Sequence, residues 1–143
     1  EYASLIEAKA PKGTIEWMGF LPTEEFQAQL GKCRALLNTP KWNEAYGNVV
    51  VESLACGVPV ISYDIGGPGE IINSGVTGFL VPPNDIPLLI ENIKRVDEID
   101  RKNCRLWAEE FASYESFAQR VFNWIKEGVE AETLDSSFVF AKE

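Results

Sequence analysis

The stretch that decides the fold of this chain reads NTPKWNEAYGNVVVESLACG and occupies residues 38–57. It holds two glutamates, Glu44 and Glu52, separated by the seven residues AYGNVVV. Those seven residues pass from a turn of small and polar side chains into an apolar segment. Three consecutive valines favour a strand by intrinsic propensity, so the local sequence alone does not settle what this stretch forms.

The flanking segments argue for a helix. Short apolar runs at 35–37 and 58–63 predict two buried strands. Parallel strands in one sheet need a crossover connection of a dozen or more residues, usually a helix. A largely buried helix at 49–57, capped by Asn48 and ended by Gly57, would supply this connection.

The remaining pattern repeats the alternation of strands and helices. Further strands are expected at 14–18 and 79–81, and further helices at 1–10, 24–30, 70–74, 86–93, 104–111 and 114–125. Thr23, Ser113 and either Asn84 or Asp85 are the expected N-caps. The 66–69 glycine segment is expected to be a tight loop, and the aromatic stripe at 114–125 to lie in the core.

This order predicts a Rossmann-like α/β fold, an open parallel sheet with C-terminal helices. Four strands are fewer than doubly wound sheets usually carry, so we expect the fold's first strands to lie outside this chain. The chain then divides into a partial domain at 1–128 and a tail at 129–143, without a regular pattern, that we expect to be partly disordered.

Composition excludes several kinds of function. The net charge of −9 argues against a broad nucleic-acid surface, and no apolar run is long enough to span a membrane. The chain has no histidine, which excludes the usual zinc and Ser-His-Asp sites. Its three cysteines are far apart and match no zinc spacing, so we expect all three to be core residues in a reducing compartment.

The chemistry of the central stretch follows from its placement. Ligands of open α/β sheets bind outside the carboxyl ends of the strands, near helix N-termini. The amides of Tyr46, Gly47 and Asn48 would there attract a phosphate, while the carboxylates of Glu44 and Glu52 would accept hydrogen bonds from hydroxyl groups on either side. This layout matches a nucleotide diphosphate sugar, with its hexose, diphosphate and ribose.

The segment 42–85 also resembles a known family, the retaining family 4 glycosyltransferases, in their C-terminal donor-binding domain. These enzymes have the GT-B fold, in which two Rossmann-like domains face each other. The resemblance covers about residues 12–127 and is carried by these motifs: Glu44-x7-Glu52, the run ACGVPV at 55–60, Gly66-Gly67 with Glu70, and Gly75-x-x-Gly78 before the strand at 79–81.

The resemblance implies a role for each matching residue. Glu44 would be the active-site residue that bonds the hydroxyls of the transferred sugar. Amides at 46–48 would hold the sugar and the phosphate, Glu52 would hold the ribose, and the loop at Gly19-Phe20 would lie beside the base. The family motif GG-x-P-E is GG-P-G-E in this chain.

The same resemblance implies an activity and partners. The expected reaction transfers a hexose from a nucleotide diphosphate sugar to an acceptor with anomeric retention, without a metal or another cofactor. The family's diphosphate-binding Arg and Lys and its N-terminal acceptor-binding domain would lie on chain upstream of residue 1, so this chain is expected to be inactive alone. The full enzyme would be cytoplasmic, with peripheral membrane association as an option.

Two other functions are compatible with the residues. The chain could be a nucleotide-binding module without catalysis, or a glycoside hydrolase that uses Glu44 and Glu52 as acid and base. The hydrolase reaction needs two carboxylates that face each other across a bond, and a phosphate-binding turn between them makes it the weaker alternative. A glutamate beside a helix start can also serve only to stabilise the helix dipole.

Overall fold

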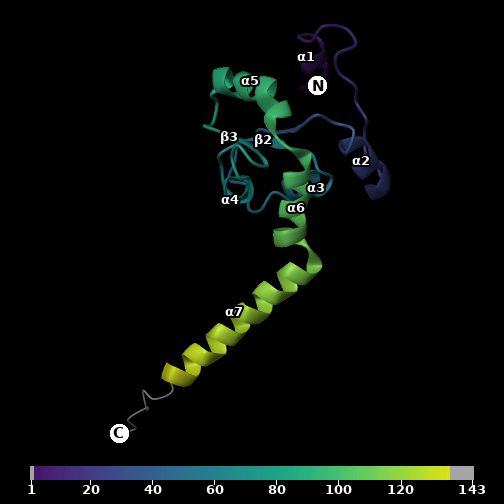
Figure 1. Ribbon diagram of the computed structural model, residues 1–143. Coiled ribbons are helices and arrows are strands. Elements are labelled where there is room, and N and C mark those ends of the chain that lie inside the picture. Colours follow the sequence, from purple (N-terminus) through teal and green to yellow (C-terminus); the bar gives the residue numbers. More distant parts are fainter. Residues whose placement is uncertain (1, 136–143) are drawn as a thin grey trace.

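The computed structural model describes residues 2–135 as a small α/β body from which one long helix projects (Figure 1). Its strands are β1 (Leu36–Asn38), β2 (Val60–Tyr63) and β3 (Gly78–Val81). Its helices are α1 (Tyr2–Glu7), α2 (Thr23–Leu30), α3 (Asn48–Ala55), α4 (Gly67–Ile71), α5 (Ile86–Arg95), the 3-10 turn η1 (Val96–Glu98), α6 (Arg101–Ala112) and α7 (Tyr114–Asp135).

The three strands form one parallel sheet in the order β1-β2-β3. The register pairs Leu36 with Val60 and Val60 with Gly78, so the three carboxyl ends lie along one edge. All four residues of β2 are buried, as expected for the central strand of a covered parallel sheet. The predicted open parallel sheet is confirmed, and its carboxyl edge becomes the place to look for a site.

The strand predicted at 14–18 is wrong. This segment is irregular and exposed, with Ile15 36% and Trp17 54% accessible, and no strand of the described residues pairs with it. Alternating side chains make a segment suitable for a strand, but the strand forms only where a neighbouring backbone supplies hydrogen bonds. Here Trp17 instead donates to the carboxylate of Glu7 at 2.5 Å.

The predicted crossover helix is confirmed as α3, although its first turn differs from the expectation. Its N-cap is Gly47, with φ 94° and ψ 57°, and Asn48 is already the first helical residue. Asn48 is therefore not the capping residue, and no side chain caps α3. At the other end Gly57 N–H donates to Leu54 and Val58 N–H to Ser53, both at 2.9 Å, which is a Schellman ending at the predicted glycine.

The hydrophobic core lies between the sheet and the helices that pack against it, among them α3 and α5. Val50 and Leu54 of α3 are fully buried, and α3 packs against α6 on one side and the strands on the other, while α5 packs against β2 and β3. Arg101 at the start of α6 donates to three carbonyls, those of Gly57 and Gly31 at 2.7 Å and of Cys33 at 3.1 Å. It thereby ties α6 to the ends of α2 and α3.

The caps and the glycine segment also differ in part from expectation. Asp85 is the cap of α5, where it accepts from Leu88 N–H at 3.0 Å, and Ser113 accepts from Ser116 N–H at the start of α7. Thr23 is not a cap, since Pro22 holds that position. The helix expected at 70–74 begins earlier, at Gly67, because Pro68 in the first turn has a φ suited to a helix and needs no N–H acceptor there.

The aromatic stripe of α7 is not core, contrary to the expectation. Phe117 is 59%, Phe122 63% and Trp124 74% accessible. The helix leaves the body after its contact with α6 and runs outward (Figure 1), so its apolar face meets no partner layer among the described residues. No helix within 2–135 is long and apolar enough to cross a membrane. Within the expected tail at 129–143, residues 129–135 are helical as the end of α7, which the sequence pattern did not predict, and residues 136–143 lie outside the described part.

The three cysteines have different environments. Cys104 of α6 is buried, and burial raises the pKa of its thiol to about 11. Cys56 is partly buried, but Cys33 is exposed, so the expectation that all three are core residues is wrong for Cys33. That residue follows α2 in a turn that lies outside the sheet's hydrophobic cluster.

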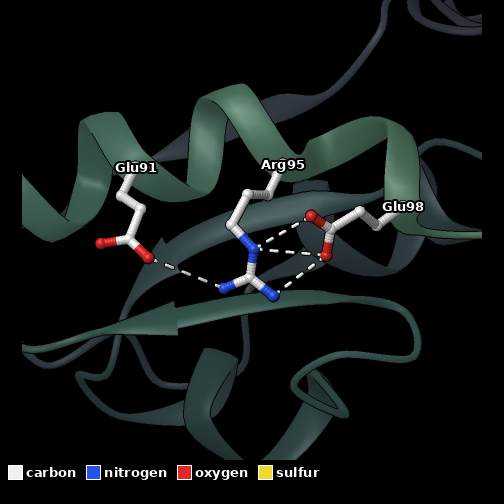
Figure 2. A network of polar contacts seen from close by, with 3 residues as sticks. All are labelled: Glu91, Arg95 and Glu98. Carbon is white, nitrogen blue, oxygen red and sulfur yellow. Dashed lines mark hydrogen bonds and ion pairs between the residues drawn. The ribbon is translucent and has the colours of Figure 1, made fainter.

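Ion pairs lie on the surface of the α5–η1 corner. Arg95 donates to both oxygens of Glu98 at 3.0–3.2 Å and lies 3.8 Å from Glu91 (Figure 2). The same guanidinium stacks over the ring of Phe79, 5.2 Å from its centroid. Hydrogen bonding to Glu98 raises the pKa of Arg95, and the hydrogen bond from Arg95 lowers the pKa of Glu98.

Candidate functional site

Two loops meet at the carboxyl edge of the sheet. The first follows β1 and carries Glu44 to the start of α3, and the second follows β2 and leads into α4. The loops join through a parallel bridge between Glu44 and Gly66 and a hydrogen bond from Gly67 N–H to the Glu44 carbonyl at 2.7 Å. This is where open α/β sheets bind ligands, so the predicted location of the site agrees with the fold.

The start of α3 is open to a ligand. Within the described residues, the N–H groups of Tyr46, Gly47, Asn48 and Val49 donate to no protein acceptor. The first hydrogen bond of the helix runs from Val50 N–H to the Gly47 carbonyl at 2.9 Å. A helix start that lacks a cap leaves both its amides and the positive end of its dipole available to an anion.

Gly47 makes this geometry possible. Its φ of 94° lies in the left-handed region, which residues with a Cβ rarely adopt. The turn at Gly47 puts Asn48 into helical geometry, and for that reason the Asn48 side chain does not fold back as a cap. Sequence reasoning named the amides of residues 46–48 and did not name that of Val49, which is also in the first turn of α3.

The two glutamates lie on either side of these amides. Asn48 and Glu52 are four residues apart on α3 and share its exposed face, where a side chain leans toward the helix N-terminus. Glu44 is partly buried in the preceding loop. In the described part of the chain, neither carboxylate has a hydrogen-bond or ion-pair partner, so both are available as acceptors.

The loop of Gly19 and Phe20 lies elsewhere. Phe20 is 96% exposed, and Gly19 lines a small cavity of about 210 Å³ with residues of α2, among them Phe26 and Leu30. No hydrogen bond or ion pair within residues 2–135 joins this loop to Glu44 or α3. The structure thus brings together the predicted residues at 44–52 and leaves the 19–20 pair separate.

Comparison with known proteins places the sequence in a family. The family model described as glycosyl transferases group 1 matches residues 1–127. This chain belongs to the group 1 glycosyl transferases. The membership confirms the resemblance to a glycosyltransferase domain that the E-x7-E, glycine and ACGVPV motifs predicted.

Individual relatives agree with this assignment. A sucrose synthase of Acidithiobacillus caldus is 33% identical over 101 residues, which are 68% of this chain and 13% of the relative. A D-inositol 3-phosphate glycosyltransferase of Mycolicibacterium smegmatis is 32% identical over 123 residues, 85% of this chain and 27% of the relative. The chain therefore spans about a quarter or less of these curated glycosyl transferases.

Solved structures show the same fold. Sucrose-phosphate synthase from Thermosynechococcus elongatus superimposes with a TM-score of 0.76 at 23% identity, over 91% of this chain and 34% of that one. HepE from Anabaena in complex with UDP-glucose gives a TM-score of 0.72 at 20% identity, over 88% of this chain and 36% of that one. The Rossmann-like half of the GT-B fold that the sequence predicted is thereby confirmed.

One feature of the candidate site had no sequence signal. The exposed ring of Tyr46 lines a groove of about 310 Å³ together with Phe117, Arg120, Val121 and Trp124 of α7. Residues 46 and 117–124 are far apart in the chain, and the position of α7 depends on the turn at Ser113. The groove shows that α7 passes close to the candidate site.

Proposed function

We propose that this chain is the donor-binding part of a glycosyltransferase that transfers a hexose from a nucleotide diphosphate sugar with retention of the anomeric configuration. The observation that carries the proposal is the pair of unpartnered carboxylates, Glu44 and Glu52, on either side of the uncapped start of α3. HepE, a structural neighbour with this fold, is known in complex with UDP-glucose, which supports a nucleotide sugar as the ligand.

Each group has a separate part in binding. The amides from Tyr46 to Val49 hold the diphosphate at the positive end of α3. Glu52, one helical turn further on, accepts from the ribose hydroxyls, and Glu44 accepts from the hydroxyls of the sugar. Gly19 and Phe20 approach the base, which requires their loop to move toward α3 or the nucleotide to extend to it.

The chemistry of this arrangement is positioning and electrostatic stabilisation. Amides aimed at the diphosphate stabilise the negative charge that grows on it as the glycosidic bond breaks. Glu44 fixes the sugar ring so that the acceptor reaches the anomeric carbon from one side. Glu44 is not assigned as a covalent nucleophile, and no metal is invoked. The acceptor binds to another domain of the full-length, cytoplasmic enzyme.

The test uses the full-length protein and begins with titration of UDP, GDP and ADP to find the nucleotide. With the matching nucleotide sugar, Glu44→Ala should lower kcat/KM about 100-fold, because it removes a group that orients the reacting sugar. Glu52→Ala should raise the KM for the donor about tenfold with a smaller change in kcat, because ribose binding is the same in ground and transition states.

Glu25→Ala is the matched control, since Glu25 is an exposed glutamate in the first turn of another helix, α2. It should leave both kinetic constants unchanged. Near-normal turnover in both site variants, or an equal loss in all three, would refute the assignment.

A further inference from the structure

The loop that carries Glu44 is held by the backbone of a second loop. Gly66 forms a parallel bridge with Glu44, and the next residue, Gly67, donates its N–H to the Glu44 carbonyl at 2.7 Å. This contact joins positions 22 residues apart, at the carboxyl ends of two neighbouring strands. It is the connection between the Glu44 loop and the rigid sheet.

The contact is so close that neither position has room for a side chain. A Cβ at Gly66 would overlap the carbonyl oxygen of Glu44 and lie 2.9 Å from its nitrogen, and a Cβ at Gly67 would overlap the carbonyl of Tyr46 and lie 2.7 Å from its Cα. Carbon atoms do not approach backbone so closely without a shift of one partner. The obstructing atoms are backbone on both sides, so any shift moves the loop itself.

The two glycines differ in one useful respect. Gly66 has a φ of 65°, which residues with a side chain rarely adopt, whereas Gly67 lies in helical backbone as the first residue of α4. Substitution at Gly66 therefore combines backbone strain with the clash, and substitution at Gly67 produces the clash alone. Gly75 offers the opposite case, with a φ of 84° and open space where its Cβ would stand.

We propose that Gly66 and Gly67 are positioning residues: Gly66 holds Glu44 at the depth where it binds the sugar part of the donor, and Gly67 holds the Tyr46 backbone that leads into the diphosphate-binding turn. This inference rests on the proposed function. The two glycines act through the backbone of the Glu44–Tyr46 loop. Because Gly66 contacts only the Glu44 backbone among the near atoms of this loop, while Glu52 is fixed by the turns and core contacts of α3, Gly66 controls recognition of the sugar more than recognition of the nucleotide.

The experiment compares two affinities in the full-length protein. The probes are the diphosphate that the wild type binds among UDP, GDP and ADP, and the glucose ester of the same nucleotide, titrated by calorimetry. Gly66→Ala should reduce the preference for UDP-glucose over UDP, or its GDP or ADP counterpart, about tenfold or more, since an ångström-scale misplacement has effects of this size. Affinity for the bare diphosphate should stay within about threefold, because the start of α3 keeps its open amides.

Gly75→Ala is the control for backbone strain, and it should lower stability while it leaves the sugar preference intact. Glu44→Asp is a second route that needs no glycine change: it withdraws the carboxylate by one methylene and should also weaken binding of the sugar nucleotide but not of the diphosphate. This variant keeps the test decisive if Gly66→Ala does not fold.

The outcomes separate the two hypotheses. If the wild type binds none of the three diphosphates or their glucose esters, the proposed function fails, and the positioning role fails with it. If the wild type prefers the sugar nucleotide and Glu44→Ala abolishes that preference, the proposed function stands. The positioning role is then overturned if Gly66→Ala keeps the preference, or, where that variant does not fold, if Glu44→Asp keeps it.

Discussion

Helices α3 and α7 both carry apolar residues at helical spacing, but their surroundings differ completely. Val50 and Leu54 of α3 are fully buried between the sheet and α6, whereas Phe117 and Trp124 of α7 are 59% and 74% exposed. The sequence pattern of α7 was the clearer of the two. The comparison shows that periodicity identifies a helix and its apolar face, while burial depends on whether another element covers that face.

The largest effect on stability is expected when one apolar side chain is truncated, and the test compares one such truncation in each helix. Leu54→Ala should destabilise the 143-residue chain by about 2–5 kcal/mol, because it leaves a cavity in packed core. Phe117→Ala should change stability by no more than about 0.5 kcal/mol, as is usual for exposed positions. Urea denaturation followed by circular dichroism measures both. A loss above about 2 kcal/mol for Phe117→Ala would mean that another surface covers α7, and the comparison would no longer hold.

The same contrast explains which parts of the fold the sequence predicted. The crossover helix α3 was predicted against the strand propensity of its valines, because two parallel strands required a connection. The strand at 14–18 was predicted from alternation alone and is wrong, because a strand needs a paired neighbour that its own residues do not encode. Local patterns therefore succeeded where topology supported them and failed where they stood alone.

The candidate site likewise has features that the sequence predicted and features that it did not. The chemistry of Glu44, Glu52 and the amides before α3 followed from a contiguous stretch, so it was predictable from residue types and spacing. The backbone contact between Glu44 and Gly66 joins two separate loops and appears in the sequence only as a pair of glycines, which is equally typical of an ordinary turn. The groove beside Tyr46 depends on the direction of α7, which no local signal encodes.

A second test concerns the polar tie that holds α3 in its buried position. Arg101→Met removes three hydrogen bonds from a guanidinium to backbone carbonyls and should cost about 1–3 kcal/mol, since the buried carbonyl of Gly57 loses its donor. Arg101→Lys should recover only part of the loss, because an ammonium lacks the planar fork that reaches several acceptors. Denaturant titration of both variants provides the measurement.

Arg34→Met is the matched control for Arg101. The Arg34 guanidinium pairs only with Asp97, and both side chains are about two-thirds or more exposed, so its loss should change stability by about 0–1 kcal/mol. Equal effects of the two substitutions would show that Arg101 does no more than an ordinary surface arginine and that packing alone positions α3.

The smallest effect is expected at the surface network of Arg95 (Figure 2). The hydrogen bond from Arg95 lowers the pKa of Glu98 in the folded chain, so the stability it contributes is present above the ordinary pKa of 4.5 and is lost as the pH falls through the lowered value. Glu98→Gln should therefore be slightly less stable than wild type at pH 7, with a difference that shrinks toward pH 3.

Glu91→Gln is the control, because Glu91 approaches the same guanidinium only to 3.8 Å, and this substitution should lower stability at pH 7 by less than Glu98→Gln does. Both effects should be smaller than that of Arg101→Met, since solvent screens exposed charges. A loss for Glu98→Gln at pH 7 as large as that of Leu54→Ala would contradict the comparison of α3 with α7 directly. An exposed polar contact would then stabilise this fold as much as a side chain buried beneath the sheet.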